Sequence, residues 1–260
     1  MLIAGTAFKG YAIAASDGTI GTAKTFLFDD STWKIRWLVV DTGHWLSGRK
    51  VLIHPSAIGA VDHELQQLPV ALTKAQIEAS PDIAQDRPVT AQMESGLYDY
   101  YGWDPYWGPN YYGPMVFGLG AFAPMPREGS LTGRIDAPEA DAMQRNFDDG
   151  DVHLRDMSVV TGYHIDAKDG SIGHVQNFLL DDATWAIRYL IVDTSNWWMG
   201  QQVLIAPYAV TEFDWGAKKI HLNVTRETVR SSPKWDPLAI IDHDYESHLH
   251  RHYGWPNTGW

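Results

Sequence analysis

The sequence predicts a mainly β protein that contains two copies of one small domain. Two near-identical segments, Phe26–Asp41 and Phe178–Asp193, lie 152 residues apart. Shorter motifs recur at the same offset without a gap, such as Gly10-Tyr11 and Gly162-Tyr163. Short apolar segments separated by turn residues are typical of small antiparallel barrels and sandwiches. A gap-free repeat of about 100 residues is too long for a solenoid unit and has the size of a small domain.

The same short strands are expected in each copy. Asp17-Gly18 predicts a hairpin turn between strands at residues 10–15 and 19–28, because glycine adopts a positive φ without steric cost. Residues 33–41 first alternate and then become continuously apolar, which predicts a strand that is buried on both faces at its end. Further short strands are expected at residues 51–53, 56–58 and 65–72.

Short helices are expected after the strands of each copy. Thr73-Lys-Ala-Gln76 matches a capping box, and Pro81 ends the helix that follows it. The equivalent Thr225–Thr228 lacks the glutamine, so its box is weaker. A second helix over residues 89–101 leads into the aromatic segment Tyr98–Trp107.

These elements divide the chain into three parts. Residues 1–103 are the first repeat with its C-terminal helices, and residues 152–260 are the second repeat with its own. Residues 104–151 connect them and are rich in glycine, proline and aromatic residues, a composition that resists regular structure. A short strand at residues 129–135 and a helix or turn at 136–146 are expected within this connector.

Composition excludes several classes of function. The net charge is −12 and no basic face is present, so no nucleic-acid partner is expected. The absence of cysteine excludes disulfides and cysteine-based metal or redox sites. Neither a signal peptide nor a transmembrane segment is expected, and the expected compartment is the cytoplasm. No dinucleotide, P-loop, esterase or zinc-protease motif occurs, so we expect no cofactor and no enzymatic activity.

The ordered motifs of each copy resemble the PRC-barrel family. The second copy carries them at Gly162–Gly173, Phe178–Asp182, Ile187–Asp193 and Val203–Pro207, and the first at Gly10–Gly21, Phe26–Asp30, Ile35–Asp41 and Val51–Pro55. The resemblance implies two small PRC-type β-barrels, each followed by short C-terminal helices. The family includes the cytoplasmic part of the photosynthetic reaction centre H subunit and the ribosome-maturation factor RimM.

Members of this family have no common catalytic residues and mostly bind other macromolecules. The resemblance therefore implies a non-enzymatic binding or scaffold protein that presents protein–protein interaction surfaces. The H subunit carries a transmembrane helix that this chain lacks. A ribosome-associated or RNA-associated role of the RimM type is an alternative, although this chain is acidic and has two PRC-like copies.

Tryptophans are the candidate interface residues, because aromatic side chains are enriched at interface centres. They are Trp33, Trp45, Trp103, Trp185, Trp197, Trp198 and Trp255. The alternative for Trp33, Trp45 and their equivalents is a place in the core. We expect the two repeats to pack with approximate two-fold symmetry, and we expect a protein partner or self-association, including a homo-oligomer. Tyr101-Gly-Trp103 and Tyr253-Gly-Trp255 are expected to be ordered and to dock on the opposite barrel or at a chain–chain interface.

Acidic and histidine side chains suggest an alternative function in metal binding or metal-dependent catalysis. Asp244, His248 and His252 are spaced to share one helix face, although a solvated polar face would show the same pattern. Asp29-Asp30 and Asp181-Asp182 are either cation ligands or turn residues. Asp41 and Asp193 are either buried carboxylates with a raised pKa or strand-end caps.

Overall fold

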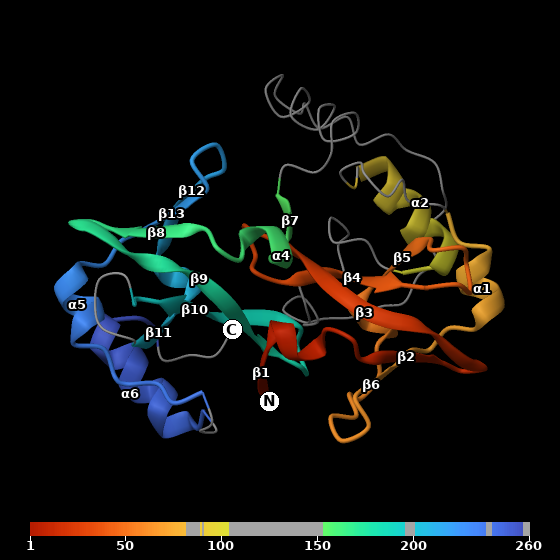
Figure 1. The fold of residues 1–260 in the computed structure, drawn as a ribbon, viewed down its shortest axis with the longest axis horizontal. Coiled ribbons are helices and arrows are strands. Elements are labelled where there is room, and N and C mark those ends of the chain that lie inside the picture. The colour runs from red at the N-terminus through yellow and green to blue at the C-terminus, as the bar shows by residue number, and fades with distance from the viewer. Residues whose placement is uncertain (82–88, 90, 104–152, 196–200, 238–240, 257–260) are drawn as a thin grey trace, which may run out of the picture. The chain divides into compact units, whose positions relative to one another are not determined.

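The computed structural model describes residues 1–81, 89, 91–103, 153–195, 201–237 and 241–256 (Figure 1). It divides into two compact units, residues 1–78 with 153–260 and residues 79–152. The first unit contains both sheets, and the second contains helix α2 (Ala91–Tyr101). The connector from residue 104 to 151, with the strand and helix expected in it, lies outside the described residues.

The first sheet has the strand order β5-β4-β3-β2-β6, with β7 beside β3. β2 and β6 pair in parallel, and the other pairs are antiparallel. The strands are β2 (Ala12–Ala15), β3 (Gly18–Asp29), β4 (Ile35–Asp41), β5 (Lys50–Ile53), β6 (Gln67–Pro69) and β7 (Leu154–Asp156). The expected strand at residues 56–58 is instead the 3-10 helix η2 (Pro55–Ala57), because Pro55 occupies a helix N-terminal position that suits its fixed φ.

The second sheet has the order β11-β10-β9-β8-β13-β12, with β1 beside β9. β13 and β8 pair in parallel, as β6 and β2 do in the first sheet. The strands are β1 (Leu2–Ala4), β8 (His164–Ala167), β9 (Gly170–Asp181), β10 (Ala186–Asp193), β11 (Gln202–Ile205), β12 (Val210–Asp214) and β13 (Lys219–Leu222).

The expected mainly β fold is confirmed, whereas closing of each repeat into a barrel is not, because neither sheet is closed among the strands described. The first sheet ends at β5 and β6, and the second ends at β11 and β12, with no pairing between these described end strands. β5 has four residues and β6 has three.

Glycine allows the strong bend of the two longest strands. Gly21 in β3 and Gly173 in β9 have φ of 154° and 141°. A Cβ atom at either residue would collide with the carbonyl group of Asp41 or Asp193 on the neighbouring strand. Only glycine therefore permits this close approach of two backbones.

The first strand of each repeat belongs to the sheet of the other repeat. β1 pairs with β9 through Leu2↔Asp181, and β7 pairs with β3 through Leu154↔Asp29. These two registers are related by the offset of 152 residues that relates the sequence motifs. The two repeats are thus interlocked, and each completes the sheet of the other, in agreement with the expected two-fold packing.

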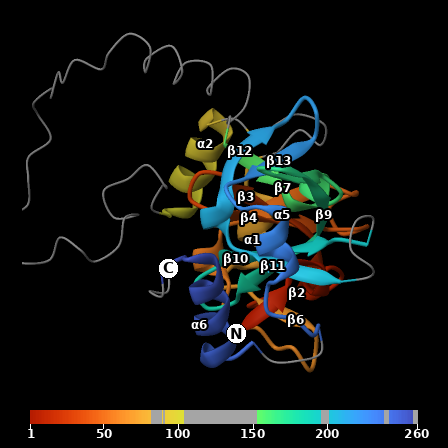
Figure 2. The ribbon, with the colours of Figure 1, turned by 90° about the vertical axis from the view of Figure 1, so that its left-hand side faces the viewer.

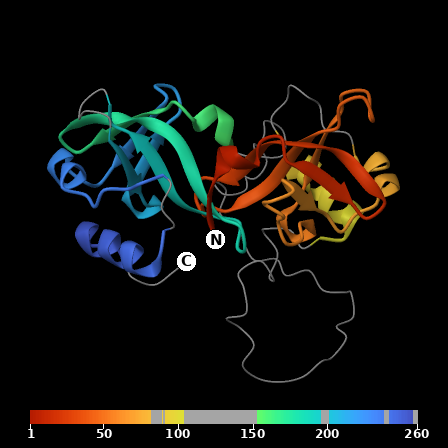
Figure 3. The ribbon, with the colours of Figure 1, turned by 60° about the horizontal axis from the view of Figure 1, so that its bottom comes forward.

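The helices of the first unit lie between the strands and after the last strand of each repeat. They are η1 (Gly5–Phe8), α1 (Lys74–Glu78), α4 (Met157–Val160), η3 (Pro207–Ala209), α5 (Arg226–Arg230) and α6 (His243–Tyr253). The capping box before α1 is confirmed, since the Gln76 N–H donates to Thr73 Oγ1 and the Thr73 N–H donates to Gln76 Oε1. α6 lies against one face of the second sheet (Figure 2), below β9 and β10 in Figure 3. None of the helices in the described part of the chain is long and apolar enough to span a membrane.

Candidate functional site

Trp33 and Trp185 lie where the two repeats meet. Both have a positive φ, 58° and 55°, which is uncommon for a bulky side chain. The Ile35 N–H donates to the carbonyl oxygen of Trp185, and the Ile187 N–H donates to that of Trp33, each at 2.8 Å. The rings are buried against the other repeat: Trp33 contacts Phe213, and Trp185 contacts Phe8 and Phe26. The contact between the repeats therefore uses both of these interface candidates.

The paired carboxylates have separate structural roles. Asp29 accepts hydrogen bonds from the N–H groups of Ser31 and Thr32, and Asp181 accepts them from the equivalent turn. Asp30 crosses to the other repeat and binds Arg155 at 2.9 Å and His153 at 2.7 Å. Asp182 crosses in the opposite direction to His63 and the N-terminal amine. These positions support the turn interpretation of the pairs.

Charge pairing across the repeats affects the acidity of Asp182. Burial disfavours its charged form, but hydrogen bonds from the N-terminal amine and His63 outweigh burial, and the pKa of Asp182 is lowered. Asp193 behaves similarly: burial opposes ionisation, but the Ser195 N–H at 2.8 Å prevails and lowers the pKa. The alternative of a raised pKa at Asp193 is therefore wrong, because the strand-end cap stabilises the carboxylate.

The proposed metal ligands do not converge. Asp244 and His248 are exposed on α6, whereas the His252 Nε2 lies 2.8 Å from the carbonyl oxygen of Thr228. Among the residues that the structure describes, no group of three or more His, Asp or Glu side chains is arranged to hold a metal ion. His252 instead joins α6 to the middle of α5.

Another face of α6 carries a buried polar cluster. The Tyr189 hydroxyl lies 2.9 Å from Glu246 Oε1 and 2.8 Å from His250 Nε2, and Arg188 binds Glu246 at 3.2 Å. Burial, followed by the charge of Glu246, raises the pKa of Tyr189, so this residue stays neutral. His250 Nδ1 in turn lies 2.5 Å from the Pro256 carbonyl oxygen and is therefore its donor. The cluster joins α6 to β10.

The Tyr-Gly-Trp segments are ordered, as expected, and the second one packs on its own helix. Gly102 and Gly254 have φ of 68° and 71°, and each ends its helix. The rings stack within each segment, Tyr101 on Trp103 at 4.2 Å and Tyr253 on Trp255 at 4.1 Å. Trp255 also contacts His250 of α6. The expectation that Trp255 docks on the opposite barrel is therefore wrong, because the left-handed turn at Gly254 folds the chain back onto its own helix.

The remaining interface candidates, Trp45, Trp197 and Trp198, lie in the segments that follow β4 and β10. Trp45 is half-buried, and the Lys74 ammonium lies 6.0 Å from its ring centre. This contact lies within the first repeat. Trp197 and Trp198 lie outside the described residues.

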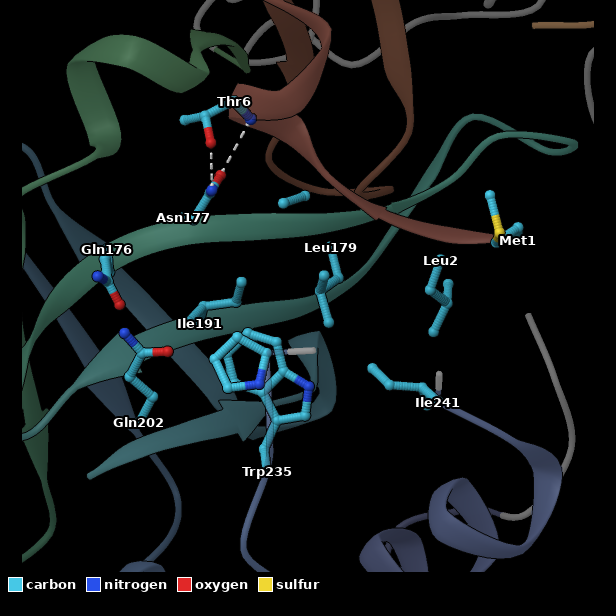
Figure 4. A pocket seen from close by; sticks show the side chains of 12 residues that line it. Met1, Leu2, Thr6, Gln176, Asn177, Leu179, Ile191, Gln202, Trp235 and Ile241 are labelled. Atoms are coloured by element: carbon cyan, nitrogen blue, oxygen red, sulfur yellow. Dashed lines mark hydrogen bonds between the residues drawn. The ribbon is translucent and has the colours of Figure 1, made fainter. Parts of the chain in front are cut away.

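An open groove of about 710 Å³ lies between β1 and the segment that joins α5 to α6. β9, β10 and β11 contribute Leu179, Ile191 and Gln202 to its floor. Figure 4 shows Trp235 in the middle, Gln176 and Gln202 at one end, and Met1, Leu2 and Ile241 at the other. Because β1 comes from the first repeat and the remaining walls from the second, the interlocking of the repeats forms this site.

The groove is mostly apolar and has uncharged hydrogen-bonding groups. The side-chain amide of Asn177 is fixed, since its Nδ2 donates to Thr6 Oγ1 and its Oδ1 accepts from the Thr6 N–H. The indole N–H of Trp235 has no hydrogen-bond partner among the described residues. None of the lining residues has an ionisable side chain. Such a lining is typical of a binding site.

The equivalent positions around the first sheet are charged. Lys24, Lys50 and Asp156 stand where the groove has Gln176, Gln202 and Ala4. The sequence motifs did not predict the groove, because they consist of positions that the two copies share. The groove could have been found from the sequence by a different signal: at the fixed offset, three charged residues of one set of positions are neutral in the other.

Comparisons with known proteins add no relative to these observations. No family model matches the chain, and no curated protein is similar to it in sequence. The resemblance to the PRC-barrel family therefore depends on the motifs quoted above.

Proposed function

We propose that this chain is a non-enzymatic binding protein built from two PRC-barrel-type repeats, and that the groove holds a segment of a partner protein. The motifs at a constant offset support the PRC-type duplication, as do the matching registers of β1 on β9 and β7 on β3. The groove is the observation that supports binding. Its lining offers apolar contact and neutral hydrogen bonds but no acid, base or nucleophile with a perturbed pKa.

The distribution of aromatic residues agrees with this proposal. Trp33 and Trp185 are buried between the repeats, so neither offers a surface to a partner. Trp235 is half-buried beside an open groove, where an arriving side chain can pack against its ring. Tryptophan residues in such positions often contribute a large share of the binding free energy of an interface.

Photo-cross-linking can test the proposed function in cells that contain this protein. A benzophenone amino acid replaces Gln202 in the groove, and in the control it replaces Lys50, the equivalent residue of the first repeat. We expect a discrete adduct from position 202 that is absent from position 50. The purified captured protein should bind the native chain, and Gln202→Lys should weaken this binding while Lys50→Gln should not.

Two results would contradict the proposal. Equal adducts from both positions would show that the groove is not selective. A captured protein that binds Gln202→Lys as tightly as the native chain would show that it does not occupy the groove. An adduct between two copies of this chain would replace the proposed partner with self-association.

A further inference from the structure

The outer edge of β1 carries main-chain groups that have no partner among the described residues. The Asp182 N–H donates to the Met1 carbonyl oxygen at 3.1 Å. This bond determines which residues of β1 turn their main-chain groups towards β9 and which turn them away. The main chain of Ile3 then faces β9, and that of Leu2 faces away from it. Among the described strands, none pairs with this outer edge, and no hydrogen bond from a described residue reaches the main chain of Leu2. In the part of the chain that the structure describes, the N–H and C=O of Leu2 therefore face an edge with no strand beside it.

β7, the equivalent strand in the other sheet, has one outward carbonyl group that is already bonded. The carbonyl oxygen of Leu154 accepts a hydrogen bond from Arg155 Nη1 at 3.4 Å. β1 has Ile3 in place of this arginine and cannot form such a bond. β7 also has Asp156 where β1 has Ala4, so a charge lies on the equivalent face. β7 therefore offers a matched comparison in which one outward carbonyl is occupied and the equivalent face carries a charge.

The open edge and the groove belong to the same surface. Leu2 and Ala4 lie on one face of β1, and both line the groove together with Leu179 of β9. Successive side chains of a strand point to opposite faces. A strand added beside β1 would therefore direct every second side chain towards the groove, and its main chain would bond to Leu2.

The lining indicates the chemistry of such a strand. Placing a charge against Leu2, Leu179, Ile191 and Trp235 would cost its hydration, and the N-terminal amine at the Met1 end of the groove is already paired with Asp182. Neutral groups would instead find hydrogen bonds at the side-chain amides of Gln176 and Gln202. The groove therefore favours apolar and amide or hydroxyl side chains.

We propose that β1 accepts an extended, uncharged segment of a partner protein as an additional strand, and that alternate apolar side chains of this segment fill the groove beside Trp235. This proposal rests on the function proposed above and specifies how the partner is recognised. The main-chain hydrogen bonds to Leu2 would align the segment with β1, and the groove would select which side chains the segment carries.

Random peptides displayed on phage, selected against the full chain, can test this proposal. We expect the enriched sequences to be uncharged, with apolar residues at every second position. Synthetic copies of these peptides are then titrated against three variants. Leu2→Pro removes the outward N–H, which takes no part in pairing with β9. Ala4→Asp introduces the aspartate that β7 carries at the equivalent position 156. Leu154→Pro makes the matched change in β7.

Leu2→Pro and Ala4→Asp should each weaken peptide binding by about tenfold or more, which corresponds to the loss of one good contact, whereas Leu154→Pro should leave it unchanged. Melting of each variant checks its fold, and Ala4→Asp decides the outcome if Leu2→Pro does not fold. Failure to enrich any peptide would overturn the proposal, as would charged peptides or equal weakening by Leu154→Pro. A partner cross-linked at position 202 that binds both β1 variants normally would overturn this proposal alone and leave the proposed function standing.

Discussion

Replacing Trp185 by alanine or by glycine should test both the packing between the repeats and the backbone at this turn. The Trp185 side chain is 7% exposed and contacts Phe8 and Phe26 of the other repeat. Loss of a packed tryptophan ring in a core costs about 3–5 kcal/mol. Both variants lose the same ring, so both should be strongly destabilised.

The difference between the two variants reports the backbone conformation. At φ of 55°, alanine suffers a steric cost of about 1–2 kcal/mol that glycine does not. Glycine loses about 0.4–1 kcal/mol through the larger entropy of its unfolded chain. The glycine variant should therefore be the more stable by about 0.5–1 kcal/mol, the reverse of the order in a regular strand or helix.

Urea unfolding followed by far-ultraviolet circular dichroism measures this difference, and equal m-values would show that the unfolded states are comparable. Trp33, with φ of 58°, offers an independent repetition in the first repeat. If alanine were as stabilising as glycine at both positions, the left-handed turn would not be a property of the protein. If neither change lowered stability by more than about 1 kcal/mol, the rings would not be part of a shared core.

Three further results are expected. Burial, and then the charge of Arg36, lowers the pKa of His54 from 6.5 to about 4, so the unfolded state takes up a proton at a higher pH than the folded state does, and the free energy of unfolding should fall as the pH drops from 6.5 towards 4. The variant His54→Ala introduces the residue found at the equivalent position 206. In urea titrations it should lose about 2 kcal/mol less stability between pH 7 and pH 5 than the native chain loses. Tyr189→Phe should destabilise the protein by about 1–3 kcal/mol in the same assay, because Glu246 and His250 each lose a buried partner; an unchanged midpoint would show that the cluster does not stabilise α6. Gly173→Ala should lower the melting temperature markedly because its Cβ would collide with Asp193, and a melting temperature equal to that of the native chain would contradict the close approach of β9 and β10.

Most of the secondary structure could be predicted from local chemistry. Asp17-Gly18 and the Phe26–Asp41 segment indicated the β2–β3–β4 meander because turn residues and apolar alternation act over a few positions. The capping box at Thr73 and the helix that ends at Tyr101 are local in the same way. The 3-10 helix at Pro55 was missed because a short apolar run does not separate a strand from a tight helical turn.

Long-range features were harder to predict. The duplication indicated that the repeats would pack together, but nothing in Leu2–Ala4 shows that this strand pairs with β9 of the other repeat. The packing of Trp255 on its own helix was not predicted, because the left-handed turn at Gly254 decides the direction of the chain after α6, and the predicted chain–chain interface stays a prediction. The groove was not predicted, since its walls come from segments more than 150 residues apart in the sequence, such as Leu2 and Trp235.

The central structural claim is that each repeat completes the sheet of the other. A protease site placed within residues 115–130 would allow the connector to be cut after folding, and size-exclusion chromatography with mass measurement would then follow the two halves. We expect them to remain together as a one-to-one complex that retains the groove, because β1 stays on β9 and β7 stays on β3. Two stable, separate monomers with the melting temperature of the uncut chain would contradict the claim.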